Sequence, residues 1–320
     1  MDGEVLELDD RKLIKKDVNL FTGGLLLYLL IGFIAFLFYI IGYFTIGSII
    51  RGKTIDEIMT SIDKDMFETG VPYLINILIG LPILFLLCKG VVRKKLTVVN
   101  KAMRWSDFFM LLCCFMSVQL VSMLIDSGAE KLFNLFGYTL RSAIESASSE
   151  STTISMFLYA SIFGPIVEEI IFRGLVMRGL ERYGKQLAIV VSAIIFGAYH
   201  GNLVQGIFAF LVGAVLGYVA MEYSLKWAIV LHVINNCLFN DLLSYAVTGL
   251  SISTQTIIFY SILGFFGLCA LIIFFIKRKE IATYFKLNKA FGLKHALSSF
   301  GMIAFLIIMF LISLIGIEKI

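Results

Sequence analysis

Three charged side chains interrupt an apolar segment near the middle of this chain. The stretch Ser161–Gly174 reads SIFGPIVEEIIFRG and carries Glu168, Glu169 and Arg173. An ionisable side chain at the centre of a bilayer costs about 2.5–3.5 kcal/mol on insertion scales, so such groups are rare unless they face a bundle interior or a water-filled cavity. The segment is therefore a candidate for chemistry. The alternative is that its charges only hold helices together.

Helical spacing separates the roles of the two glutamates. Glu169 and Arg173 are four residues apart, so they share a helix face and are expected to form an ion pair. Glu168 points about 100° away from that pair, which leaves its carboxylate free to face a cavity. The preceding Gly164-Pro165 is expected to kink the helix, because proline removes a backbone donor, and so to admit water at the carboxylate.

Two histidines add to this set from other apolar segments. His200 follows Phe196 by four residues and His232 precedes Asn236 by four, so each pair shares a helix face. Taken singly, a membrane histidine or asparagine is often a hydrogen bond between helices, and Phe196 is expected to be a packing residue that positions His200. Two glutamates, two histidines and an asparagine on three spans are harder to explain as repeated helix contacts.

These residue types can activate water for hydrolysis. A carboxylate and one of the two histidines can share the removal of a proton from a bound water. The second histidine and an asparagine amide can donate hydrogen bonds to a developing oxyanion. Alternatively, Glu168, His200 and His232 are ligand types of a catalytic zinc site, although the sequence has no H-E-x-x-H helix. A mechanism without a cofactor is favoured, and zinc is the alternative.

The composition identifies the class of protein. The 320 residues are 59% hydrophobic and 16% charged, with a mean hydropathy of +0.92. Long, continuous apolar runs predict an all-α, polytopic transmembrane helical bundle and exclude a β-barrel. The net charge of +4 suggests no nucleic-acid partner. The five cysteines lie in or beside apolar runs without C-x-x-C spacing, so we interpret them as small apolar residues.

Eight or nine spans are expected, with a catalytic core of four helices. The apolar runs cover residues 21–49, 73–88, 108–125, 154–177, 187–200, 207–222, 227–245, 256–276 and 300–317. We divide the chain into spans one to three with a cytosolic N-terminal segment (1–153), the core (154–246) and C-terminal spans (247–320). The basic loops at 89–104 and 277–294 fall on one side, which predicts a cytoplasmic N-terminus. A short surface helix is expected around 132–140.

The motifs on the core spans resemble those of the CPBP family of intramembrane proteases, named for CAAX proteases and bacteriocin-processing proteins. The pattern E-E-x-x-x-R, F-x-x-x-H and H-x-x-x-N stands at Glu168–Arg173, Phe196–His200 and His232–Asn236. The resemblance covers roughly residues 154–245. It implies an endopeptidase in which Glu168 and His200 act on water, His232 and Asn236 form the oxyanion site, and Glu169 and Arg173 support the architecture.

The resemblance does not name a substrate. The expected partners are a membrane-associated protein or peptide and the lipid bilayer, and the oligomeric state stays open. Frequent Phe, Ile and Lys favour a bacterial cell membrane, where leader peptides, bacteriocins, pheromones or membrane regulators are substrates to expect before prenylated CAAX proteins. A non-catalytic regulatory or immunity protein is the alternative function. A transporter is disfavoured, because the sequence shows no internal repeat.

Overall fold

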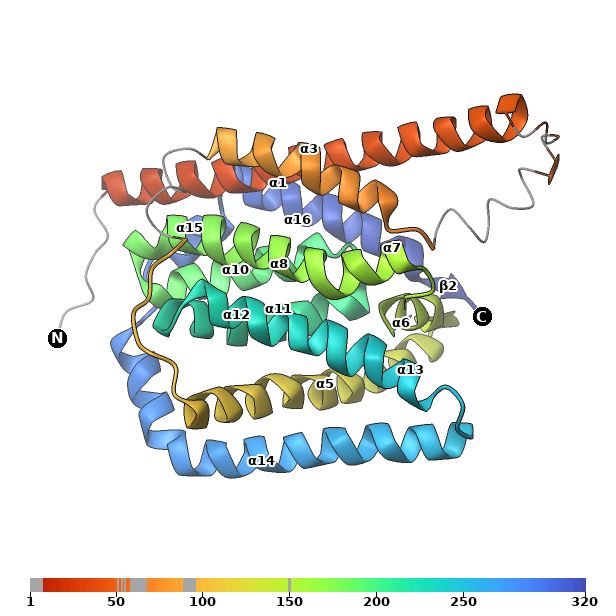
Figure 1. Cartoon of the computed structure of the whole chain (residues 1–320). Helices are drawn as coiled ribbons and strands as arrows, with labels where there is room; N and C mark the ends of the chain where they lie inside the picture. The colour runs from red at the N-terminus through yellow and green to blue at the C-terminus, as the bar shows by residue number, and fades with distance from the viewer. Residues whose placement is uncertain are drawn as a thin grey trace.

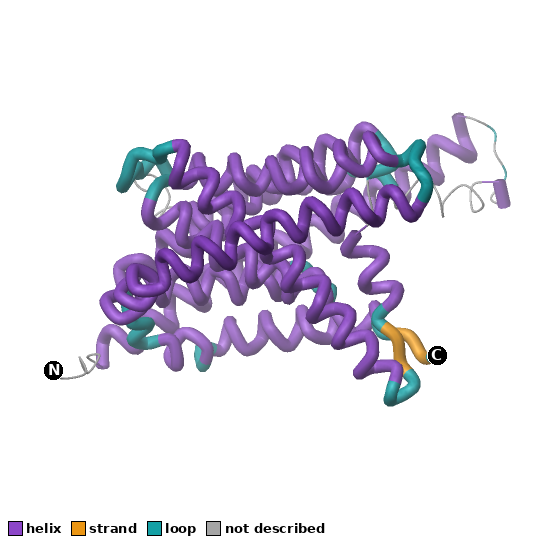
Figure 2. The backbone as a smooth tube through the Cα atoms, turned by 90° about the horizontal axis from the view of Figure 1, so that it is seen from below, coloured by secondary structure: helices purple, strands orange, loops and turns teal. Residues whose placement is uncertain are grey.

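The chain folds as a bundle of long helices, seen in a computed structural model (Figure 1). The structure describes residues 8–50, 52, 54, 56–57, 68–88, 96–148 and 151–320. Helix forms most of this part of the chain, and Figure 2 shows the two short strands beside the C-terminus. The strands β1 (Tyr138–Thr139) and β2 (Glu318–Lys319) pair antiparallel, with Tyr138 opposite Lys319. The predicted all-α, polytopic helical fold is confirmed.

Most of the apolar runs fold as single helices, and four of the nine include π or 3₁₀ segments. The N-terminal and peripheral helices are α1 (Leu8–Thr45) with its π-helical end η1 (Ile46–Ile50), α3 (Val71–Leu87), α5 (Trp105–Asn134), α6 (Arg141–Ser148), α14 (Ile252–Leu287), α15 (Leu293–Leu297) and α16 (Phe300–Ser313) with η6 (Leu314–Gly316).

The central helices come from the middle of the chain. One is built from α7 (Ile154–Phe157), η2 (Leu158–Phe163), α8 (Gly164–Glu169), η3 (Ile170–Met177), α9 (Arg178–Leu180) and η4 (Glu181–Tyr183). The others are α10 (Lys185–Tyr199), α11 (Leu203–Glu222), and α12 (Leu225–Val233) continued by η5 (Ile234–Leu242) and α13 (Leu243–Val247). Figure 1 shows them in the middle of the bundle, with α1 and α3 on one side and α5 and α14 on the other.

All nine predicted spans fall on helices. Five helical segments are long and apolar enough to cross a membrane: Asp9–Ile50, Trp105–Asn134, Ile154–Tyr183, Leu203–Glu222 and Ile252–Leu287. Shorter apolar helices cover Val71–Leu87, Lys185–Tyr199 and Phe300–Gly316. The chain is therefore an integral membrane protein. The count of eight or nine spans stays a prediction, and the basic residues at 89–95 lie outside the described residues.

The expected surface helix around residues 132–140 is wrong. Helix α5 continues unbroken from the third predicted span to Asn134, and the short helix α6 begins only at Arg141. Between them Gly137 adopts a positive φ of 80°, which turns the chain into β1. Leu132 and Phe133 therefore extend a membrane helix instead of starting a new one, and Leu135 and Phe136 lie in the turn after it.

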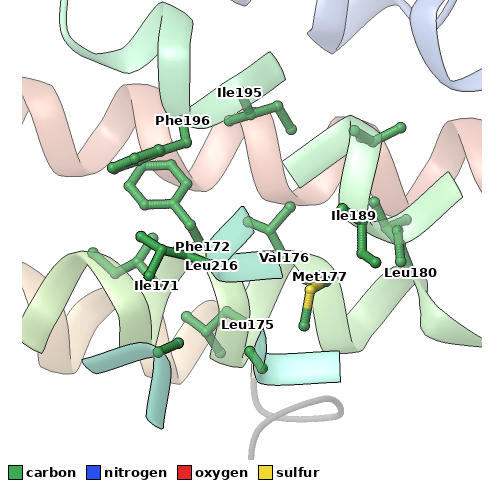
Figure 3. Close-up of a cluster of buried hydrophobic side chains, with 14 of the residues drawn as sticks. Ile171, Phe172, Leu175, Val176, Met177, Leu180, Ile189, Ile195, Phe196 and Leu216 are labelled. Carbon is green, nitrogen blue, oxygen red and sulfur yellow. The ribbon is translucent and has the colours of Figure 1, made fainter. Parts of the chain in front are cut away.

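Close packing of α10, α11 and η3 forms the centre of the bundle. Figure 3 shows the buried side chains there, among them Phe172, Leu175, Phe196 and Leu216. Gly197 and Gly206 let α10 and α11 approach closely, since a β-carbon on Gly197 would lie 2.7 Å from the carbonyl oxygen of Gly206. Small residues commonly allow such contacts between membrane helices. This tight packing fixes the helices that carry the candidate site.

Candidate active site

The helix with the two glutamates departs from α-helical hydrogen bonding on both sides of them. The π-helical segments η2 and η3 flank α8, which starts at Gly164-Pro165 and ends at Glu169. Such π-helical insertions are found frequently at functional sites. The sequence predicts a kink at Pro165, and the structure places the irregularity before and after that residue.

Glu169 is held in a buried ion pair. Its side chain is 0% exposed, and its Oε1 atom lies 3.0 Å from Nη1 of Arg173. This is the pair expected from the spacing of four residues. The Arg173 guanidinium carbon also lies 4.2 Å from the centre of the Phe196 ring, a cation–π contact. Gly213 on α11 leaves room for it, because a β-carbon there would lie 3.2 Å from Arg173 Nη2.

His232 joins the two glutamates, a contact that the sequence does not reveal. Its Nδ1 atom lies 2.9 Å from Glu169 Oε1, and its Nε2 atom lies 3.7 Å from Glu168 Oε2. An ionised carboxylate only accepts hydrogen bonds, so Nδ1 carries the proton that points at Glu169. Nε2 then has a free lone pair in the neutral ring, and it donates a hydrogen bond only when the ring is protonated.

His200 ends α10 and is oriented by the backbone. Its Nδ1 atom lies 2.8 Å from the carbonyl oxygen of Phe196. A carbonyl can only accept, so Nδ1 is the protonated nitrogen and Nε2 carries the lone pair of the neutral ring. The Phe196 ring lies edge-on to His200, with 4.8 Å between ring centres. Phe196 therefore contacts both Arg173 and His200.

Asn236 is tied to the helix that carries the glutamates. Its Nδ2 atom donates to the carbonyl oxygen of Ala160 in η2 at 3.0 Å, and its Oδ1 accepts from Asn235 Nδ2 at 2.9 Å. Gln119 of α5 in turn donates to Asn235 Oδ1. Sequence reasoning did not identify Gln119 or Asn235. The only signal was that polar side chains occur in apolar spans.

A small pocket opens beside Glu168. It is lined by Tyr28, Ile77, Tyr159, Gly164, Val167, Glu168, Ile171, Phe172 and Tyr199. Its interior offers about 10 Å³ for the centre of a water molecule, which is room for about one water. The Glu168 side chain is 21% exposed, against 0% for Glu169. One carboxylate therefore faces a pocket and the other is enclosed.

The zinc alternative requires three ligands that converge on one point. Among the described residues, no three side chains of the types His, Cys, Asp and Glu lie together in a way that could hold a metal ion. Glu168 and His232 are near each other, but the structure does not assemble them with His200 into such a set. The preference for a mechanism without a cofactor stays a prediction.

Asp241 connects η5 to η2 and to the segment just before α7. Buried to 1% exposure, it accepts from the Ser151 backbone N–H at 3.0 Å, from Ser151 Oγ at 3.2 Å and from Ser161 Oγ. The sequence showed Asp241 only as a neighbour of Asn240.

Replacing Asp241 should destabilise the protein. Asp241→Ala leaves buried donors without an acceptor, at about 1–3 kcal/mol for each unsatisfied group. We expect a clearly lower midpoint of thermal unfolding for the purified protein in lipid nanodiscs. The control is Asn240→Ala, at an exposed neighbouring position. Equal midpoints for Asp241→Ala and wild type would contradict a structural role for this carboxylate.

The fold and the site together define a polytopic helical membrane protein with a buried glutamate–arginine–histidine cluster next to a water-sized pocket. Residues 150–238 match the family model described as type II CAAX prenyl endopeptidase Rce1-like. This segment, about a quarter of the chain, is an Rce1-like domain of the CPBP family, and it holds all seven predicted site residues. The match confirms the family indicated by the motifs. Comparison with curated proteins and with solved structures gives no match.

An Rce1-like domain indicates a membrane protease, which is a hydrolase. The match supports CAAX-type intramembrane endopeptidase activity in general. The apolar helices and the family together imply a membrane-embedded substrate and a lipid environment.

Proposed function

We propose that this protein is an intramembrane endopeptidase in which Glu168 and His200 activate water to hydrolyse a peptide bond. The observation that carries the proposal is the different environment of the two glutamates. Glu169 is enclosed with Arg173 and His232, whereas Glu168 lines a pocket that has room for water. A carboxylate that lines a water-sized pocket is a suitable general base, and the family resemblance assigns His200 as its partner on the water.

The proposed reaction balances as an ordinary hydrolysis. Water loses a proton to Glu168, assisted by the lone pair on His200 Nε2, and its oxygen attacks the carbonyl carbon of the peptide bond. The π electrons of that bond move to the carbonyl oxygen. When the tetrahedral intermediate collapses, the C–N bond breaks and the proton passes from Glu168 to the leaving amine. Microscopic reversibility permits one carboxyl group to serve as base and then as acid.

Glu169 supports this reaction through His232. The carboxylate of Glu169 fixes the ring through Nδ1, so Nε2 points toward Glu168. This resembles the way a third group orients the histidine in other hydrolases. The resemblance to the CPBP family implies that His232 and Asn236 donate hydrogen bonds to the oxyanion. For His232 that role requires the protonated ring, because a neutral ring pinned at Nδ1 has no proton on Nε2.

We propose the membrane orientation predicted from the basic loops, with the N-terminus in the cytoplasm. This orientation requires successive spans to cross the membrane in opposite directions, and three contacts support that arrangement. Arg182 in η4 forms an ion pair with Asp17 near the start of α1. Lys185 and Tyr284 both donate hydrogen bonds to Glu222 at the end of α11. The beginning of α1, the η4–α10 turn, the end of α11 and the end of α14 therefore meet at one end of the bundle. We assign this end to the cytoplasm of a bacterial cell.

Substituting either core histidine should abolish cleavage. His200→Ala removes the assisting base and His232→Ala removes the group that links the glutamates, so we expect at least a 100-fold loss of kcat/KM for each. Purified variants would be assayed on internally quenched peptides that are chosen from a random library because the wild type cleaves them. His295→Ala in α15, outside the site, is the matched control and should keep wild-type activity. Full activity of either core variant would remove that histidine from the assignment.

A further inference from the structure

The pocket at Glu168 is lined in part by tyrosines that the proposed reaction does not use. Tyr28, Tyr159 and Tyr199 all line it, and they come from α1, η2 and α10. In the described part of the chain none of these three hydroxyls has a hydrogen-bond partner. Their hydrogen-bond capacity is available to whatever enters the pocket.

Tyr28 has the smallest exposed fraction of the three. It is only 4% exposed, whereas Tyr159 and Tyr199 are half-buried. Gly80 on α3 fixes its ring, because a β-carbon at that position would lie 2.9 Å from two atoms of the Tyr28 ring. The phenol is therefore held at one wall of the pocket by helices outside residues 150–238.

The donors assigned so far to the oxyanion are largely committed elsewhere. His232 directs its Nδ1 proton to Glu169, and Asn236 donates from Nδ2 to the carbonyl oxygen of Ala160. A neutral O–H donor that needs no protonation and already lines the pocket with Glu168 is better placed to meet the charge that develops on the scissile carbonyl oxygen. Fixed donors of this kind are a large source of rate enhancement in hydrolases.

We propose that the Tyr28 hydroxyl donates a hydrogen bond to the oxyanion of the tetrahedral intermediate, and so is a catalytic residue contributed by α1. This inference rests on the proposed endopeptidase function. In this step no proton leaves Tyr28. The carbonyl π pair moves onto oxygen as water adds, Tyr28 O–H hydrogen-bonds the resulting alkoxide, and the bond is released when the C–N bond breaks.

The test removes the hydroxyl and keeps the ring. Full-length wild type, Tyr28→Phe and Glu168→Ala would be purified in nanodiscs and assayed on the internally quenched peptides that the wild type cleaves. We expect Tyr28→Phe to lower kcat about 100-fold, the usual effect of losing one oxyanion donor, with KM changed less than about threefold. Its midpoint of thermal unfolding should stay close to that of wild type, because the buried ring remains.

Tyr73→Phe is the matched control. Tyr73 stacks on Tyr159 with 4.6 Å between ring centres but does not line the pocket, so the variant should keep wild-type kcat. If Glu168→Ala is inactive but Tyr28→Phe has an unchanged kcat, or changes only KM, the proposed role of Tyr28 is wrong. If Glu168→Ala cleaves the peptides as fast as wild type, the proposed endopeptidase function itself fails.

Discussion

Glu168→Gln is expected to be inactive and folded. The amide keeps the shape of the side chain but cannot accept a proton from water, and general-base catalysis is worth about 10²–10⁴-fold in rate. We therefore expect a loss of about 10³-fold in kcat on peptides cleaved by the wild type. The midpoint of thermal unfolding should change little, because Glu168 lies at a pocket and its contact with His232 is only a 3.7 Å approach.

A glutamate elsewhere in the chain provides the control for this change. Glu145 in α6 pairs with Arg141 at an exposed position, and Glu145→Gln should cleave at the wild-type rate. Activity of Glu168→Gln close to that of wild type would exclude this carboxylate as the base. Loss of both activity and folding would instead indicate a structural role like that of Glu169.

Arg173→Met should strongly destabilise the protein. The substitution leaves the Glu169 carboxylate fully buried without its cation, and breaking one partner of a buried pair typically costs about 3–5 kcal/mol. Apart from the 3.0 Å approach of Nη1 to Glu169 Oε1, the guanidinium nitrogens have no hydrogen-bond partner within the described residues, so the intact pair itself is not expected to add much net stability. We expect a large fall in the free energy of unfolding, measured by denaturant titration in mixed micelles.

Neutralising both partners should restore most of this stability. The double variant Glu169→Gln/Arg173→Met has no buried charge at these positions, and a glutamine oxygen can still accept from His232 Nδ1. Arg141→Met, which breaks an exposed pair in α6, should leave the unfolding transition nearly unchanged. If Arg173→Met is as stable as wild type, or if the double variant is no more stable than the single one, an unpaired buried charge on Glu169 is not the cause of the expected loss of stability.

The apolar runs predict the helices well, because a bilayer leaves few alternatives. Backbone groups in lipid must bond within the segment, so each long apolar run becomes a helix wherever the structure describes it. The same logic fails at α5. There the hydrophobic pattern weakens after Ile125, yet the helix continues to Asn134. A change from continuous apolar to mixed polar and apolar residues therefore shows where a helix leaves the apolar layer. It does not show where the helix ends.

The local part of the site follows from the sequence, but the contacts between helices do not. The Glu169–Arg173 pair is a property of one helix and is predicted from its spacing. The His232–Glu169 hydrogen bond joins residues 63 positions apart, and its existence depends on how α12 packs against α8. Tyr28 is further removed, since it lies on the first helix and no motif includes it. Helical periodicity shows which face of its helix a residue lies on, but it does not show which other helix packs against that face.

The most direct test of proteolysis at Glu168 is a comparison of peptides and protein termini in cells that express wild type or Glu168→Gln at equal membrane abundance. We expect a defined set of peptides and new termini from membrane-associated proteins to be present with wild type and absent with the variant. Those sequences would also identify the substrate. Identical profiles in the two strains, together with a phenotype on deletion of the gene, would contradict catalysis and favour a non-catalytic membrane binding or immunity protein.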